Sequence, residues 1–182
     1  YLESMKILEK RVNDVISGKK GEFLWILEHN TVYTAGSSSN KRDLIDKNIK
    51  VIRTKRGGKH TLHSPGQKVV YFVLNLNRRK KDIRELVTKI ENCIIEILNE
   101  YNIKSFPDRK NIGIWVKKNN NTAKIAAIGI RVKKWIAYHG FAINVSNDLS
   151  KYNKIVPCGI KDREITSLKE LGIKDLSNID YI

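Results

Sequence analysis

With 182 residues and a hydrophobic content of 41%, the chain is long enough to form one domain, residues 1–182, with a proper core. No run of about 18 uncharged apolar residues occurs, so the sequence predicts no membrane-spanning helix. The 35 Lys and Arg residues exceed the 19 Asp and Glu residues by 16, which predicts an acidic partner. No basic helix or RNA-binding aromatic stretch accompanies this charge, so the sequence favours neither nucleic acid nor a membrane as that partner.

The first predicted element is an amphipathic helix, because apolar residues recur at helical spacing from Leu2 to Ile16 and Gly18 follows as a stop. A short apolar run at 23–27 predicts a buried strand. The chain then passes through 31–36 into the loop 37–40, whose small polar residues indicate mobility.

The stretch 56–67, between predicted strands at 50–54 and 69–76, combines an arginine, two adjacent glycines, two histidines and a Pro-Gly turn. A glycine-bearing polar loop held between strands is a common place for function. Gly57 and Gly58 lack a Cβ atom, so a ligand can approach the main chain closely. The alternative is a hairpin connection whose glycines only turn the chain. The combined residues favour a site.

The clearest helix begins at Asp82, which stands three residues before Glu85 at the spacing of a capping box. Its apolar positions from Ile83 to Tyr101 form one wide stripe. Cys93 lies within that stripe, so we expect it to be a core residue that behaves as a small hydrophobe.

The second half reads as antiparallel strands at 111–116, 122–132 and 135–145, joined by turns rich in asparagine and lysine. Lys124 is a cation on an otherwise apolar strand, and such a lysine usually points to solvent. The whole pattern predicts an α/β (α+β) domain, with a central mixed and largely antiparallel sheet flanked by helices.

Cys158 lies between Pro157 and Gly159 on a shaped loop, which makes it a candidate nucleophile, although a loop cysteine without a recognised partner is more often incidental. The two cysteines occur in different contexts and indicate no disulfide, so we expect a reducing, cytoplasmic environment. The sequence contains no zinc-type cysteine spacing, Walker loop or dinucleotide fingerprint. Because the chain starts with Tyr1 rather than Met, we expect the natural termini to extend further.

Several segments in order resemble the octanoyltransferase family of the biotin/lipoate protein ligase superfamily. The segments are Arg56-Gly57-Gly58 through His63-Ser64-Pro65-Gly66-Gln67, Lys124 to Gly129, Tyr138 to Val145, Ile155 to Gly159 with Thr166-Ser167-Leu168, and, more weakly, Leu27 to His29 with Val32 to Thr34. The similarity covers nearly the whole chain. It departs from the family at Leu62, where an aromatic residue is usual, and at Ser64, where glycine is usual.

The resemblance implies transfer of an octanoyl group from octanoyl-acyl carrier protein to a specific lysine of lipoyl domains, the first step of endogenous protein lipoylation. The acceptors implied are 2-oxoacid dehydrogenase complexes and the glycine cleavage H protein, with no ATP or metal. Cys158 would carry the octanoyl thioester, and Lys124 would be the second catalytic residue. The substrate-binding residues implied are Arg56, Gly57, Gly58, Lys59, His60, Thr61, Leu62, His63, Ala127, Ile128, Gly129, Gly140, Phe141 and Ala142.

The chemistry agrees with this reading, because a free thiol with a pKa of about 8.5 is mostly protonated at neutral pH, and a nearby ammonium favours the nucleophilic thiolate. Three alternatives remain at this point. An ATP-dependent lipoate or biotin ligase would need an adenylate site and would not need Cys158. A basic nucleic-acid-binding module would bind with steep salt dependence. An inactive homologue would serve only to dock a carrier protein.

Overall fold

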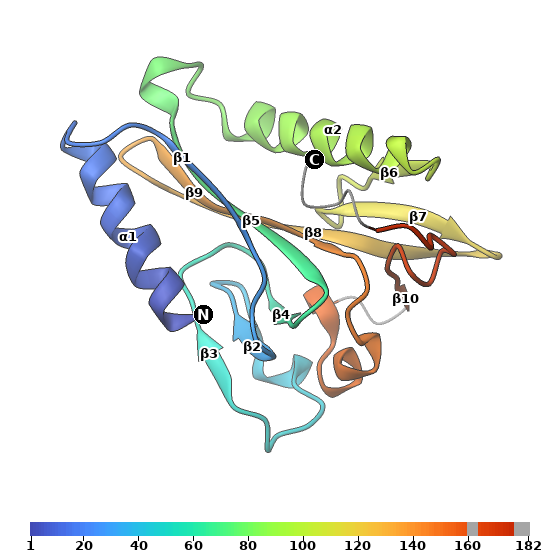
Figure 1. Ribbon diagram of the computed structural model, residues 1–182. Helices are drawn as coiled ribbons and strands as arrows, with labels where there is room; N and C mark the ends of the chain where they lie inside the picture. The colour runs from blue at the N-terminus through green and yellow to red at the C-terminus, as the bar shows by residue number, and fades with distance from the viewer. Residues whose placement is uncertain (160–163, 177–182) are drawn as a thin grey trace.

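The computed structural model describes residues 1–159 and 164–176, and its centre is a large sheet with strand order β1-β5-β9-β8-β7-β6 (Figure 1). All neighbours along this path are antiparallel, and the two-residue β10 pairs in parallel with β8. The strands are β1 (Phe23–Leu27), β5 (Gln67–Asn75), β6 (Ser105–Pro107), β7 (Ile114–Lys118), β8 (Asn121–Lys133), β9 (Ile136–Asn144) and β10 (Glu164–Ile165). The expected mixed α/β class, with a largely antiparallel sheet, is confirmed.

Two helices pack against opposite faces of this sheet, α1 (Leu2–Ile16) on one and α2 (Ile83–Glu100) on the other. Side chains alternate between the faces of a strand. On β5, Val73 accordingly joins the core cluster under α1, whereas Phe72 joins the cluster under α2. The Asp82 side chain caps α2 by accepting hydrogen bonds from the first-turn backbone, as the capping-box spacing predicts.

A smaller sheet of strand order β3-β2-β4 lies beside the large one (Figure 1). It consists of β3 (Val51–Arg53), β2 (Val32–Ala35) and β4 (His60–His63), and it has a core cluster of its own around Tyr33 and Leu62. Short 3-10 helices complete the structure: η1 (Lys41–Asp43), η2 (Leu76–Arg78), η3 (Leu149–Lys154) and η4 (Pro157–Gly159). In the parts of the chain that the structure describes, no helix is long and apolar enough to cross a membrane.

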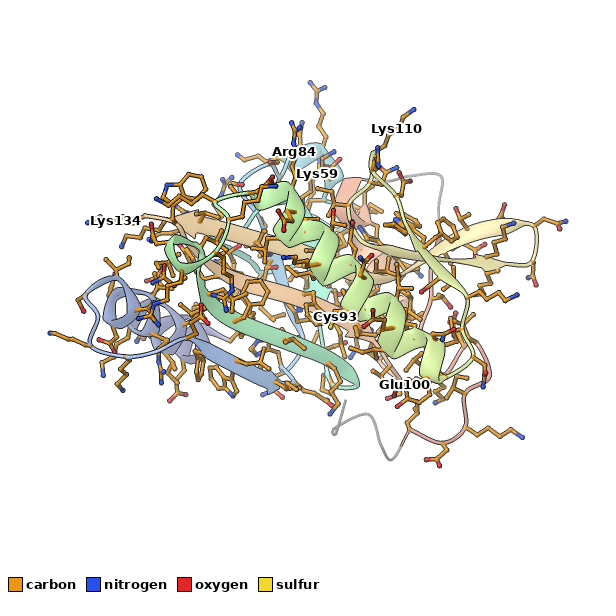
Figure 2. All side chains as sticks on the ribbon, turned by 90° about the horizontal axis from the view of Figure 1, so that it is seen from above. Lys59, Arg84, Cys93, Glu100, Lys110 and Lys134 are labelled. Carbon is orange, nitrogen blue, oxygen red and sulfur yellow. The ribbon has the colours of Figure 1, made fainter. Side chains whose placement is uncertain are left out.

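The prediction that Cys93 lies in the core is wrong. Its side chain is exposed, and only Ile90, Ile94 and Leu98 of α2 are fully buried. The buried face of α2 is therefore narrower than the stripe of apolar residues along the helix, and Cys93 lies outside this buried face. Figure 2 looks down onto α2 with the sheet behind it and labels Cys93 on this helix.

A β-bulge in β8 sets the direction of Lys124. Trp115 of β7 pairs with Lys124, and the adjacent Ile114 pairs with Ala126, so Ile125 is an extra residue in β8. A bulge shifts the alternation of side chains by one position. Lys124 therefore shares a face of the sheet with Ala127 and Gly129, which lie beyond the bulge.

Candidate active site

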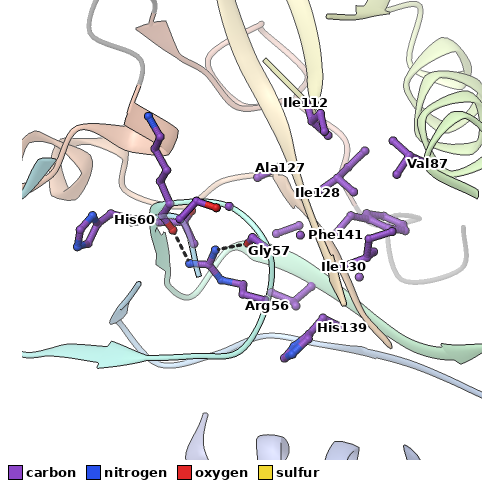
Figure 3. A pocket seen from close by; sticks show the side chains of 18 of the residues that line it. Arg56, Gly57, His60, Val87, Ile112, Ala127, Ile128, Ile130, His139 and Phe141 are labelled. Carbon is purple, nitrogen blue, oxygen red and sulfur yellow. Dashed lines mark hydrogen bonds between the residues drawn. The ribbon is translucent and has the colours of Figure 1, made fainter. Parts of the chain in front are cut away.

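A pocket of about 460 Å³ lies between the loop that contains Arg56 and the strands β8 and β9 (Figure 3). In the close-up, Arg56 and Gly57 stand on one side, and Ile112, Ile128 and Val87 stand on the other. The lining area is mostly apolar, with cations at Arg56, Lys59, Lys110 and Lys124. A pocket of this size and character suits a medium-length aliphatic ligand with one polar end.

Hydrogen bonds fix the loop that forms the first side of the pocket. The Arg56 guanidinium is 8% exposed and donates to the carbonyl oxygens of Thr34, Gly57 and Lys59. Gly36 packs directly against this loop, and a Cβ atom there would collide with the Gly58 carbonyl oxygen. The missing Cβ atom of Gly36 thus allows this close approach of the two chain segments.

Lys124 is only 4% exposed, so it does not point to solvent as an isolated strand lysine usually does. Its Nζ atom donates to the Ile112 carbonyl oxygen at 2.8 Å and lies 5.3 Å from the centre of the Trp115 ring. Gly113 makes room for it, because a Cβ atom at that position would overlap the lysine side chain. The site therefore holds a buried amine at one end of the pocket.

Behind Lys124, a buried hydrogen-bond network joins β4, β5, β9 and the chain after β10. Both ends of the Gln67 amide form hydrogen bonds. Its Oε1 lies 2.7 Å from His63 Nδ1, and its Nε2 donates to Asn144 Oδ1 at 2.8 Å. Asn144 donates to the Thr166 carbonyl oxygen, and the Thr166 backbone N–H donates to the Lys124 carbonyl oxygen. Since every side chain here is buried, the network fixes the backbone that carries Lys124.

Three histidines around the pocket are held neutral by burial. Burial lowers the pKa of His63 to about 3 and the pKa values of His29 and His139 to about 4. The nearby Arg56 charge acts in the same direction on His63 and His139. His29 forms a 2.8 Å hydrogen bond with the Tyr71 hydroxyl, whose pKa burial raises. These side chains therefore act as uncharged hydrogen-bonding groups at neutral pH.

The structure brings most of the predicted site residues to one pocket. The lining includes Arg56, Gly57, Gly58, Lys59, His60, Thr61, His63, Lys124, Ala127, Ile128, Gly129, Gly140, Phe141 and Ala142. Leu62 lies elsewhere: it is fully buried in the core cluster of the small sheet. For Cys158 the backbone is described, within η4, and the side chain lies outside the described residues. Its neighbour Gly159 lines the pocket beside Lys59.

Sequence reasoning missed the residues that seat Lys124, namely Ile112, Gly113 and Trp115. A glycine within a strand-like segment was the available signal for Gly113. It also missed Ile83 and Val87, which come from α2 and line the pocket. Their spacing on an amphipathic helix looks the same as that of core residues. Among the described residues, no group of three or more His, Cys, Asp or Glu side chains could hold a metal ion.

Comparison with known proteins agrees with the fold. A bipartite lipoate protein ligase from Thermoplasma acidophilum superposes with a TM-score of 0.69 at 14% identity, over 89% of this chain and 68% of that one. Plasmodium falciparum LipL1 in complex with lipoate superposes with a TM-score of 0.60 at 22% identity, over 89% of this chain and 47% of that one. At these identities the likeness shows a shared fold. The family model of the lipoyl protein ligase A/B catalytic domain matches residues 1–181, so the chain belongs to this family.

Curated relatives narrow the family further. Octanoyltransferase from Rickettsia peacockii is 46% identical over all of this chain and 90% of its own length. Octanoyltransferases from Ehrlichia chaffeensis and a Wolbachia of Brugia malayi are 45% and 43% identical, over 100% and 96% of this chain and 84% and 85% of their own lengths. The chain is a member of the octanoyltransferase family of acyltransferases.

Proposed function

We propose that this protein transfers an octanoyl group from octanoyl-acyl carrier protein to a specific lysine of lipoyl domains, through a thioester on Cys158. The observation that supports it most is the buried amine of Lys124 at a largely apolar pocket, which Gly159, the residue after Cys158, also lines. The family membership and the names of the relatives point to the same reaction.

The reaction proceeds in two balanced steps. The Cys158 thiolate attacks the thioester carbonyl of the donor, the bond from that carbonyl to the carrier sulfur breaks, and the carrier thiol leaves with a proton. The neutral amine of the acceptor lysine then attacks the Cys158 thioester, forms the amide, loses a proton and releases the thiolate. As an ammonium, Lys124 stabilises the Cys158 thiolate in the first step and donates the proton with which the carrier thiol leaves. The neutral Lys124 amine that results accepts the proton that the acceptor lysine loses in the second step.

No ATP is needed for this sequence, because thioester exchange is nearly isoenergetic and conversion of a thioester to an amide is downhill. The alternative is an ATP-dependent ligase. Its support is a lipoate-protein ligase A whose structure was solved with ATP and which superposes with a TM-score of 0.69 at 14% identity. At 14% identity, that likeness shows a shared fold and no more. The octanoyltransferase relatives are about three times as similar in sequence and favour direct transfer.

The net charge of +16 supports acidic protein partners. An acyl donor and an acceptor domain that are both acidic would be steered toward the pocket by long-range attraction. We therefore expect the association rates of both substrates to fall as salt increases, whereas the rate of transfer within the bound complex stays the same.

Intact-protein mass spectrometry tests the proposal directly. The protein is mixed with octanoyl-acyl carrier protein without ATP, beside Cys158→Ala as the matched variant. We expect a mass increase of one octanoyl group in the parent protein, absent from the variant and discharged by a lipoyl domain. A folded protein that gains no octanoyl group, and modifies the acceptor only with free octanoate and ATP, would replace this proposal with the ligase.

A further inference from the structure

A second hollow, of about 680 Å³, lies against the small sheet, on the face that also carries Tyr33 and Leu62. Its floor is apolar, with Ala35 from β2, Val51 from β3 and Leu44 after η1. It adjoins the pocket of the active site, because His60 lines both. The hollow is also tied to the chain that leads into Cys158: the Val156 backbone N–H donates to the Asp43 carbonyl oxygen at 2.7 Å.

Four exposed cations line this hollow. They are Lys41, Arg42, Lys47 and Arg53. None of them forms an ion pair with a carboxylate of the described residues, whereas nearby Asp46 is engaged with Lys154. Cations that line a concave surface with low-dielectric walls raise the positive potential there. The hollow is therefore suited to an anion.

The inner wall of the hollow carries a buried polar group that lacks a partner. His60 is 5% exposed, and its Nδ1 atom has no hydrogen-bond partner among the described residues. Its ring points away from Arg56 and the active-site pocket (Figure 3). A buried nitrogen without a partner is costly unless a ligand or water satisfies it. The groups that act electrostatically on His60 are Asp43, Arg56 and Arg53, and the Asp43 carboxylate is outnumbered by the four lining cations.

We propose that this hollow binds the phosphate and adjoining aliphatic part of the phosphopantetheine arm that bears the donor's acyl thioester. The inference rests on the proposed function. A phosphate matches the lining cations and His60, and the dimethyl-substituted carbon chain beside it matches the apolar floor. A slender arm that ends in the adjacent pocket would follow the hollow past His60, whereas carboxylates on a flat protein surface would not enter it.

Binding is tested first, without turnover. The His60 imidazole signals in NMR spectra are assigned by comparison with His60→Gln, and the protein is titrated with phosphopantetheine or with pantetheine. We expect phosphopantetheine to shift the His60 signals and raise the His60 pKa, which burial otherwise lowers. Pantetheine, which lacks the phosphate, should leave them unchanged. No shift with phosphopantetheine, or an equal shift with both, would overturn the proposal.

The matched variants are Arg42→Gln/Arg53→Gln, within the hollow, and Lys10→Gln/Lys117→Gln, which removes the same charge from exposed positions outside it. The rate of Cys158 acylation is compared for octanoyl-phosphopantetheine and octanoyl-pantetheine. We expect the hollow variant to lower the rate with the phosphorylated donor by about tenfold and to leave the other donor unchanged. The control variant should change neither rate.

The outcomes separate this inference from the proposed function. Acylation of Cys158 with no preference for the phosphorylated donor would keep the transferase and overturn the phosphate site. Phosphopantetheine that binds at His60 in a protein that no donor acylates would keep the site and overturn the transferase. If the hollow variant is impaired only with intact octanoyl-acyl carrier protein, the cations contact the surface of that protein instead, and the proposal fails.

Discussion

The two sides of the active-site pocket are held in place by different kinds of interaction. On the side of Lys124, position depends on two hydrogen bonds. The buried Lys124 amine donates to the Ile112 carbonyl oxygen, and the backbone N–H of the buried Thr166 donates to the Lys124 carbonyl oxygen. On the side of α2, Val87 and Ile128 contribute only apolar volume and are half-buried. The first side has little freedom, because each polar group has a specific partner. The second can change shape with one side chain.

This difference teaches which substitutions should affect chemistry and which should affect selectivity. A buried polar group that loses its partner costs the full desolvation free energy, whereas an exchange of apolar side chains of similar volume is usually tolerated. Changes near Lys124 and Asn144 should therefore reduce the rate of transfer or the stability of the fold. Changes at Val87 should alter the preferred acyl length.

The largest expected effect comes from Lys124→Met, which keeps an unbranched apolar side chain and removes the amine. We expect the single-turnover rate of octanoyl transfer to fall by about a thousandfold, since positioned acid–base groups contribute on that scale. The unfolding transition in urea should show that the fold persists. Lys117→Met, at an exposed position of the neighbouring strand β7, is the control. A Lys124→Met rate within tenfold of the parent rate would remove Lys124 from the mechanism.

The second-largest expected effect is a loss of folding stability in Asn144→Ala. Asn144 is 5% exposed, and its loss leaves the Thr166 carbonyl oxygen and the Asn147 side-chain amide without the hydrogen bonds they form with it. The Gln67 amide keeps the Leu62 carbonyl oxygen and the Tyr152 hydroxyl as acceptors. We expect the free energy of unfolding in urea to fall by about 3 kcal/mol, from two buried groups left unsatisfied. The exposed Asn121→Ala serves as the control, with almost no change. A loss below about 1 kcal/mol for Asn144→Ala would show that the network is dispensable.

The sequence predicted much of the fold and part of the site, and the reasons are physical. Periodicity found α1, α2 and the long strands β8 and β9, because alternation and helical spacing are local properties. The loop from Arg56 to Gln67 was recognisable because a hairpin connection needs glycines but does not need an arginine and two histidines beside them. The surroundings of Lys124 were not predictable, because they depend on the extra residue Ile125 in β8 and on Gly113, which precedes β7. Exposure of Cys93 depends likewise on how far the sheet extends beneath α2.

A smaller effect should appear as a dependence of stability on pH, and His139 is its clearest source. Its pKa in the folded protein, about 4, lies below the unfolded value of about 6.5, so the unfolded chain binds more protons between these values. The stabilisation is complete above pH 6.5 and is lost as pH falls toward 4, by about 2 kcal/mol at pH 5. His139 has a φ of 71°, which asparagine tolerates.

His139→Asn should therefore reduce the fall in unfolding free energy between pH 7 and pH 5, measured in urea at both values. The remaining fall comes from groups such as His63, which is also buried and neutral. If the parent protein and the variant lose the same amount of stability over this range, protonation of His139 is not coupled to unfolding.

The smallest effect tests the apolar side of the pocket. Val87→Phe adds volume at a lining position on α2, so the end of an eight-carbon chain should meet the new ring while a six-carbon chain should not. We expect the ratio of octanoyl to hexanoyl transfer rates to fall by about tenfold, the scale of one or two methylene groups in an apolar pocket. Ile95→Phe, half-buried on the same helix and away from the pocket, is the matched control. If both variants change the ratio equally, α2 affects selectivity through its packing on the sheet. If only Val87→Phe changes it, the acyl chain runs from Lys124 toward α2.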